Sequence, residues 1–267
     1  MIIDGNKYTV GADPELFMGL NGEFISAHNT IKGDKLNPFL VNKGGVQVDG
    51  MALEFNIDPA SSEEEFIDNI VSVKATLKDM IGDMDFLETA SVMFDEDFIK
   101  DIPVVNKVLG CSPDYNAWSF EENATPNSDL MMRTAGGHAH IGGFFSENEF
   151  DYTHYLKGAR LSRILDSTVG VYSILWDKDD KRREMYGKAG SFRPKTYGME
   201  YRSLSNMWVF NEKLMSFVYQ GIEEALRLFH TEYEPDPMFR KIIDNSDRGN
   251  KFFQDNQVVE KWGFNYV

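Results

Sequence analysis

The chain has 267 residues, of which 42% are hydrophobic and 13% aromatic, which is enough for a sizeable core and unlike a disordered chain. Its formal net charge of −16 opposes contact with phosphate backbones, so the composition argues against general nucleic-acid binding. The single cysteine, Cys111, excludes an internal disulfide, and the first residues contain no basic segment and no long apolar run. We therefore expect a soluble, cytoplasmic protein without a membrane span, folded as a single domain over residues 1–267.

Short runs of alternating apolar residues predict strands along the whole chain. In chain order, these runs cover residues 8–10, 16–18, 24–27, two segments within 44–56, 86–93, 136–143 and 197–204. A break is expected at Asp13 and Pro14, between the first two runs. The pair Asn21 and Gly22 predicts a hairpin turn.

Apolar residues at helical spacing predict four helices, over residues 61–81, 152–176, 211–233 and 238–245. The first begins at a capping box within residues 61–65. Residues 95–133 are rich in loops, and their length predicts a short helix or a lid. Strands and helices follow one another without a regular βαβ order, which predicts an α+β fold with a largely antiparallel sheet.

Two histidines stand one residue apart in the glycine-rich segment 136–143. In a strand, residues i and i+2 point to the same face, so His138 and His140 should converge. The flanking glycines leave room for a ligand close to the backbone. The pair is therefore a candidate metal or ligand site, and the alternative is two buried histidines that are hydrogen-bonded within a sheet.

Three further strand-like segments carry charged pairs, two of them at i and i+2 and one on either side of the turn at Gly50. These residues are Asp13 and Glu15, Asp49 and Glu54, and Glu200 and Arg202. If the four segments are neighbours in one sheet, one face becomes a pocket of carboxylates and imidazoles. Crowded carboxylates need cations to stay ionised, and oxygen-rich sites suit Mg²⁺ or Mn²⁺, while an added imidazole suits Mn²⁺ or Zn²⁺. Any one pair, taken alone, is equally consistent with solvated acids on a sheet surface.

A basic segment lies between Lys178 and Arg202, where eight of the chain's 27 Lys and Arg residues gather. Arginine forks bind phosphate or carboxylate oxygens, so this segment predicts an anion site, although residues 178–183 alone could be a solvated loop. Metal ligands and arginines on one sheet face are typical of phosphoryl transfer. The sequence contains no P-loop and no Rossmann glycine fingerprint, so a nucleotide would have to bind to another fold.

Four motifs, in the same order, resemble those of the carboxylate–amine ligases of glutamine-synthetase fold. They are Gly-Ala-Asp-Pro-Glu at 11–15, Asp-Gly-Met-Ala-Leu-Glu-Phe-Asn at 49–56, Gly-His-Ala-His-Ile-Gly at 137–142 and Tyr-Gly-Met-Glu-Tyr-Arg at 197–202. The chain looks most like the phage and bacterial amidoligases (COOH-NH2 ligase type 2), relatives of the glutamate–cysteine ligases. Gly198 stands where the glutamine-synthetase pattern usually carries an arginine, which bears on substrate handling more than on metal binding.

This resemblance implies a curved, largely antiparallel sheet with helices on one face, like the catalytic domain of glutamine synthetase. Its concave face would hold ATP and two or three Mg²⁺ ions, or Mn²⁺. The residues that match metal ligands are Asp13, Glu15, Asp49, Glu54, His138 and Glu200. Those that match catalytic residues are Arg193, Arg202 and Glu200, and those assigned to the bound nucleotide are Arg183, Lys188 and His140.

The implied activity joins a small-molecule or peptide carboxylate to an amine through an acyl phosphate, with release of ADP and phosphate. The sequence leaves three alternatives open. One is a phosphotransferase on the same kind of sheet, as in the guanidino kinases. The second is a zinc-dependent hydrolase that uses His138, His140 and an acid, and the third is a binding protein that has kept the scaffold without catalysis. The acid, the amine and the oligomeric state are not identified by the sequence.

Overall fold

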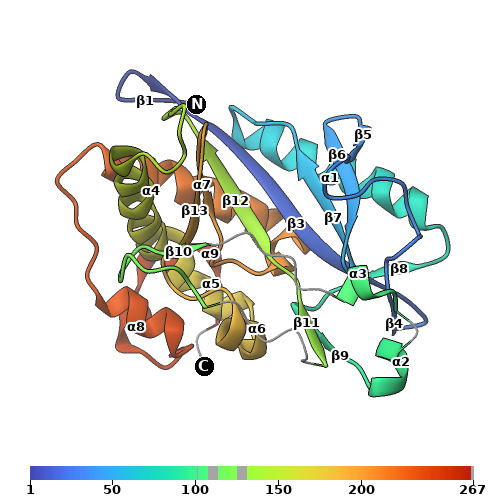
Figure 1. Cartoon of the computed structure of the whole chain (residues 1–267). Coiled ribbons are helices and arrows are strands. Elements are labelled where there is room, and N and C mark those ends of the chain that lie inside the picture. The colour runs from blue at the N-terminus through green and yellow to red at the C-terminus, as the bar shows by residue number, and fades with distance from the viewer. Residues whose placement is uncertain (101, 108–113, 125–130, 266–267) are drawn as a thin grey trace.

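The structure is a computed structural model that describes residues 1–100, 102–107, 114–124 and 131–265. Cys111 lies outside the described residues. Figure 1 shows a long, twisted sheet that crosses the molecule, with helices packed against it. No helix in the described part of the chain is long and apolar enough to cross a membrane.

Within the described residues, the main sheet has ten strands, and all of its ladders are antiparallel. Eight strands follow one another across the sheet in the order β10 (Tyr115–Asn116), β13 (Ser191–Lys195), β14 (Gly198–Tyr201), β12 (Gly137–Gly142), β3 (Thr9–Leu20), β7 (Ala52–Ile57), β6 (Gly44–Asp49) and β5 (Phe39–Val41). The other two, β4 (Glu23–Ile25) and β8 (Asp85–Leu87), both pair with the end of β3. The predicted largely antiparallel sheet is thus confirmed, while its likeness to glutamine synthetase stays a prediction.

The predicted break at Asp13 and Pro14 is wrong, because β3 runs through both residues without interruption. On one side, Pro14 lies opposite Gly137 of β12. On the other side, Val10 pairs with Ala60 and Glu15 pairs with Glu54. Between these two pairs, the segment 54–60 has one residue more than β3. Pro14 lies between these two pairs. Proline has no backbone N–H to donate, and an irregular pairing of this kind, as at a β-bulge, tolerates that loss.

Two other predicted strands differ from the structure. Residues 86–93 are not one strand, because a turn at Thr89 separates β8 from β9 (Ser91–Met93), which pairs with β11 (Met132–Thr134) in a separate small sheet. The strand predicted at 197–204 is shorter and ends at Tyr201. A second small sheet joins β1 (Ile2–Ile3) to β2 (Asn6–Lys7).

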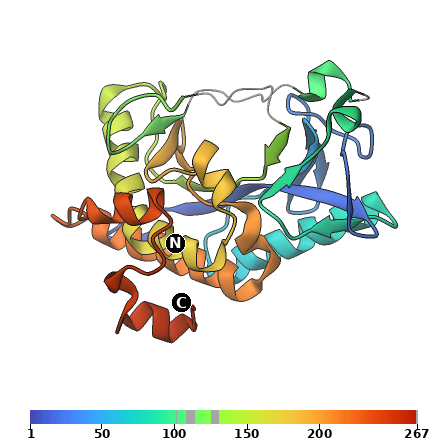
Figure 2. The ribbon, with the colours of Figure 1, turned by 90° about the horizontal axis from the view of Figure 1, so that it is seen from below.

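The long helices cover one face of the sheet, as Figure 2 shows. They are α1 (Glu63–Ile81), α4 (Tyr152–Leu165), α5 (Val171–Trp176) and α7 (Glu212–Phe229), and α8 (Met238–Asp244) and α9 (Gln257–Trp262) follow. The helix predicted at 152–176 is continuous, with one π-helical turn (Asp166–Gly170) between α4 and α5. At the start of α1, the Ser62 hydroxyl accepts from Glu65 N, while the Glu65 carboxylate accepts from Ser61 N, one residue before the expected position.

Three short helices lie on the other side of the sheet, which corrects the expectation of helices on one face only. They are α2 (Glu96–Lys100), α3 (Val104–Lys107) and α6 (Asp180–Met185). The first two fall in the segment 95–133, where a short helix was predicted. Residues of α3 and α6 line the cavity described below.

Successive side chains of β3 point alternately to the hydrophobic core and to the opposite face of the sheet. Ala12, Leu16 and Met18 are buried in one large hydrophobic core with residues of α1, α4 and α7. Asp13 and Glu15, which alternate with them, point to the opposite face. The sheet therefore has an apolar face under the long helices and a polar face that remains accessible.

Candidate functional site

The register of the sheet brings the four charged segments together. Asp13 of β3 lies opposite His138 of β12, and Glu15 of β3 lies opposite Glu54 of β7. His140 of β12 lies opposite Glu200 of β14. Residues directly opposite in an antiparallel pair share one face of the sheet. The four segments are thus neighbours on one face, as the sequence predicted.

Of these residues, Asp13, Glu15, Glu54 and His138 line a cavity of about 320 Å³ on the polar face of the sheet, whereas His140 and Glu200 are not part of its lining. Its lining is strongly charged. Six basic residues take part, namely Lys35, Arg133, Arg182, Arg193, Lys195 and Arg202, together with five acids, Asp13, Glu15, Asp49, Glu54 and Asp114. In a chain of net charge −16, this concentration of cations marks the cavity as a place for anions as well as for metal ions.

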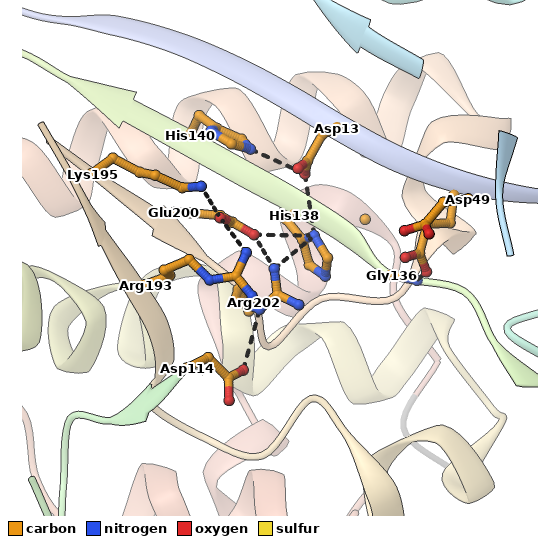
Figure 3. Close-up of polar contacts among 12 residues, drawn as sticks. Asp13, Asp49, Asp114, Gly136, His138, His140, Arg193, Lys195, Glu200 and Arg202 are labelled. Carbon is orange, nitrogen blue, oxygen red and sulfur yellow. Dashed lines mark hydrogen bonds and ion pairs between the residues drawn. The ribbon is translucent and has the colours of Figure 1, made fainter. Parts of the chain in front are cut away.

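One end of the cavity is built around Glu200, whose side chain is completely buried. Arg193 Nη1 lies 3.2 Å and Lys195 Nζ 3.1 Å from Glu200 Oε2, and Arg202 contacts Oε1. Asp114 accepts a hydrogen bond of 3.2 Å from Arg202 Nε. Figure 3 shows these side chains converging from β13, β14 and the loop before β10. We call Glu200, Arg193, Lys195 and Arg202 the basic cluster.

The charge of Glu200 is fixed by its neighbours. Burial alone would raise its pKa, but the Arg202 guanidinium, with further help from His140 and His138, holds the pKa well below its usual range despite the nearby Asp13. The carboxylate therefore stays ionised and keeps three cationic side chains together at the cavity wall.

The two histidines meet at Asp13. His138 Nδ1 lies 3.2 Å and His140 Nε2 lies 3.0 Å from Asp13 Oδ1, although the latter contact lacks hydrogen-bond alignment and is an ion pair only. Burial would raise the pKa of Asp13, but His140 and His138 hold it well below its ordinary value. Burial would likewise lower the pKa of His140, and Asp13 raises it. The Tyr197 hydroxyl contacts His140 Nδ1.

The position of the His138 ring depends on Gly136. A Cβ atom at residue 136 would lie 2.3 Å from His138 Nε2, closer than such atoms approach. The same glycine donates its backbone N–H to Glu15 Oε2 at 2.6 Å. The glycine-rich segment therefore places one imidazole and one carboxylate of the site, in line with the close approach expected of it.

The other end of the cavity holds three carboxylates, Glu15, Asp49 and Glu54, which we call the acidic cluster. Each offers an oxygen within 4.8 Å of those of the other two. Burial, and then repulsion by Asp13, Glu15 and Asp49, raises the pKa of Glu54 well above its ordinary value. Burial also raises the pKa of Glu15, and Asp49 adds to this effect. Lys35 Nζ lies 3.2 Å from Asp49 Oδ2 and supplies a counter-charge to this cluster.

A second group of possible cation ligands comprises Asp13, His140 and Glu200, again within 4.8 Å of one another. The two groups differ in their surroundings. Glu200 is already contacted by three basic side chains, whereas the acidic cluster carries more negative charge than its neighbours offset. The acidic cluster is thus the better fit for a divalent cation among the described residues.

None of the three predicted nucleotide contacts lines the cavity, although His140 contacts Asp13, which does. Arg183 is buried against Asp177, with 3.5 Å between Nη2 and Oδ2, and neither Arg183 nor Lys188 lines the cavity. Arg182, the neighbour of Arg183 on α6, lines it instead. Successive residues on a helix point about 100° apart, so only one of these two arginines can face the site.

Several residues of the site were not singled out from the sequence. Lys195 could have been found, because it stands at i+2 from Arg193 in β13 and so shares its face. Asp114 and Lys35 come from loops that carry no such spacing, and only the structure brings them to the cavity.

The antiparallel sheet thus carries the acidic cluster and the basic cluster on one face, so carboxylate oxygens and cationic N–H donors line the same cavity. Residues 124–232 match the family described as phage phiEco32-like COOH.NH2 ligase-type 2. The match includes the motifs of β12 and β14, and it confirms the predicted resemblance to the type 2 carboxylate–amine ligases over this part of the chain. The relationship supports an enzyme of the ligase class. No curated protein matches the chain.

Proposed function

We propose that the protein is an ATP- and Mg²⁺-dependent ligase that joins a carboxylate to an amine through an acyl phosphate. The observation that carries this proposal is a single cavity with an acidic cluster at one end and a basic cluster at the other. Phosphoryl transfer needs both, because cations neutralise the nucleotide phosphates and arginines stabilise the group in transfer. The family match supports an amide as the product.

The acidic cluster would hold the divalent ion. Glu15, Asp49 and Glu54 offer oxygen ligands alone, which suits Mg²⁺ or Mn²⁺ better than softer metals. When bound, Mg²⁺ would neutralise phosphate oxygens of the nucleotide. The mixed group of Asp13, His140 and Glu200 is a second candidate site, with His138 beside it.

The basic cluster would hold the phosphoryl group and the substrate carboxylate. Arg193 and Arg202 are fixed by the buried Glu200, so their guanidinium groups are positioned before a ligand binds. Prepositioned charges of this kind cost no reorganisation during reaction. Asp114 restrains Arg202 from the opposite side.

The reaction would proceed in two steps. An oxygen of the substrate carboxylate attacks the γ-phosphorus of ATP, the bond to the bridging oxygen breaks, and ADP leaves. The amine nitrogen then attacks the acyl carbon of the acyl phosphate, the acyl C–O bond breaks, and inorganic phosphate leaves while the nitrogen loses a proton. No protein nucleophile is required, so the side chains act by positioning and by charge.

Calorimetric titration of ATP, with and without Mg²⁺, tests the nucleotide site. We expect saturable binding that needs Mg²⁺ and that weakens about tenfold or more in Glu54→Gln, since an acidic ligand to the ion is worth at least one charge-assisted contact. Glu64→Gln, which changes an exposed acid on α1, should leave binding unchanged. Absence of binding at millimolar ATP would refute the proposal.

Product analysis separates the ligase from the alternatives. Acid and amine pools that yield ADP, free phosphate and an amide support the ligase. A phosphorylated acceptor without free phosphate would indicate a phosphotransferase instead. One tightly bound zinc ion without nucleotide binding would favour a hydrolase built on Asp13, His140 and Glu200. Binding of Mg-ATP without any turnover of such pools would favour a non-catalytic protein.

A further inference from the structure

Arg182 differs from the other buried arginine of α6. Both side chains are almost fully buried, with 3% of Arg182 and 4% of Arg183 exposed. Arg183 forms an ion pair with Asp177, whereas Arg182 has no carboxylate at ion-pair distance among the described residues. Arg182 lines the cavity and Arg183 does not. One of two adjacent arginines is therefore neutralised inside the fold, and the other faces the cavity without a direct anionic partner.

The hydrogen bonds of Arg182 do not satisfy its guanidinium. The group has five N–H donors. Nη1 donates to Ser203 O and Nη2 to Arg202 O, both at 3.3 Å, and the buried Nε–H, like that of Arg183, has no partner. Burial lowers the pKa of Arg182 to about 10, against the more distant charges of Asp177 and Glu15, so the group remains a cation at neutral pH. A buried cation of this kind is costly until an anion approaches it.

The loop after α6 is shaped around this guanidinium. Gly187 has a φ of +72°, and a Cβ atom there would lie 2.2 Å from Arg182 Nη1 and 2.9 Å from Ser203 O. Only glycine meets both the conformation and the close approach. Gly187 also lines the cavity, so the same residue leaves space for the guanidinium and for a ligand.

Arg182 also adjoins the basic cluster. Its Nη2 donates to the backbone oxygen of Arg202, whose side chain contacts Glu200. The donors that remain on Arg182 are thus added to a wall that already carries Arg193, Lys195 and Arg202. Unlike these three residues, Arg182 does not form an ion pair with Glu200.

We infer that Arg182 is an oxyanion-binding residue of the cavity, which receives a phosphate or carboxylate oxygen of a substrate. The inference rests on the proposed function for the identity of that substrate, which is the nucleotide or the acid to be activated. The buried guanidinium, its missing partner and the glycine that frees it are the observations behind it. A fork of N–H donors binds such oxygens in pairs, which sets Arg182 apart from a point charge such as Lys195.

Thermal unfolding and calorimetry with inorganic phosphate and with malonate test this inference without ATP or metal. The variants are Arg182→Gln, which removes the charge, and Arg182→Lys, which keeps the charge but loses the fork. Arg183→Gln is the matched control, because it changes a neighbouring arginine of equal burial that is already paired. Failure of ATP binding would leave this test intact, so the two proposals can fail separately.

We expect wild-type protein to bind at least one probe, and Arg182→Gln to weaken that binding by about tenfold or more, as loss of a charge-assisted bidentate contact should. Arg182→Lys should lie between the two, and Arg183→Gln should bind like wild type. If only phosphate binding depends on Arg182, the residue contacts the nucleotide. If only malonate binding depends on it, the residue contacts the acid, and if both do, it contacts a position that the two ligands share.

The stability of the free protein provides a second readout. Because Arg182→Gln removes a buried charge without a direct partner, its Tm without added anion should equal or exceed that of wild type, while Arg183→Gln should lower Tm. A fall in Tm for Arg182→Gln as large as that for Arg183→Gln would assign Arg182 a structural role and overturn the inference. Unchanged affinity for both probes in Arg182→Gln and Arg182→Lys would overturn it as well.

Discussion

Glu200 is the residue on which the basic cluster depends. Its carboxylate is completely buried and contacts Arg202, Arg193 and Lys195, while His138 Nδ1 lies 3.4 Å away. The resemblance to known ligases assigns it to metal binding and catalysis. The structure suggests a further task, because a single carboxylate keeps three mutually repelling cations in position. An experiment on Glu200 therefore has to measure stability and ligand binding together.

We expect Glu200→Gln to lower the free energy of unfolding by about 3–5 kcal/mol, the usual cost of breaking a buried ion pair, and to abolish ADP formation. Urea unfolding and an ADP assay below the new Tm measure the two effects. Added phosphate should restore part of the lost stability, because it can neutralise the exposed cations. Glu223→Gln, which breaks a solvent-exposed pair with Arg227, should cost less than about 1 kcal/mol. Equal losses in the two variants would contradict this account of Glu200.

The start of β12 shows how a strand positions an imidazole. Gly136 lies under the His138 ring, and its backbone does not need a positive φ, so alanine suits the conformation but not the space. We expect Gly136→Ala to lower the free energy of unfolding by about 1–3 kcal/mol, the usual cost of overpacking, because the buried His138 ring has to move. Displacement of the ring should also weaken Mg-ATP binding, measured by calorimetry.

Gly45→Ala is the control for that variant. Residue 45 lies on β6, and its Cβ would meet Asn56 at 3.4 Å, an ordinary contact. It should bind Mg-ATP like wild type. If Gly136→Ala also binds normally, the position of His138 is unimportant for the nucleotide.

The π-helical turn between α4 and α5 carries a buried carboxyl group. Asp166 accepts hydrogen bonds from Trp118 Nε1 at 2.6 Å and from the Tyr201 hydroxyl at 2.7 Å. Burial raises the pKa of Asp166 to about 7 despite these donors. Trp118 follows β10, the strand that Asp114 precedes, and Tyr201 is the neighbour of Glu200. The turn therefore holds two segments that carry residues of the site.

The raised pKa predicts how stability depends on pH. Between pH 4 and pH 7 the folded state retains a proton that the unfolded chain has released, so this contribution is complete at low pH and is lost as pH rises through about 7. Relative to Asp166→Asn, which cannot titrate, wild type should lose about 2 kcal/mol between pH 5.5 and pH 7.5. Urea unfolding across that range measures the difference. Parallel curves for the two proteins would show that Asp166 does not titrate there.

The described part of the chain contains one large hydrophobic core, which draws residues from Ile3 to Val259 and lies between the sheet and the long helices. A smaller cluster of Phe17, Ala52 and Ala135 is separate from it. The single domain over residues 1–267 stays a prediction. We expect one cooperative unfolding transition, with coincident curves from tryptophan fluorescence and far-UV circular dichroism. Two separated transitions would indicate two domains.

Much of this arrangement could be predicted from local spacing. Pairs at i and i+2 placed His138 with His140 and Glu200 with Arg202 on common faces, because strand geometry requires it. The choice between Arg182 and Arg183 could not be predicted in this way, since it depends on how α6 is rotated against the sheet. The continuity of β3 through Pro14 was also missed, because it depends on an offset in the pairing with a distant segment.

The central place of β3 has a consequence for the kinetics of folding. Asp13 meets His138 across 125 residues of chain, and Glu15 meets the backbone of Gly136 across 121. Contacts this distant in sequence form slowly, because a long loop must close before they contribute any stability. On a ribosome, the first half of the chain would emerge with one edge of its longest strand still without β12. Ligand binding would therefore be among the last properties that a newly made chain acquires.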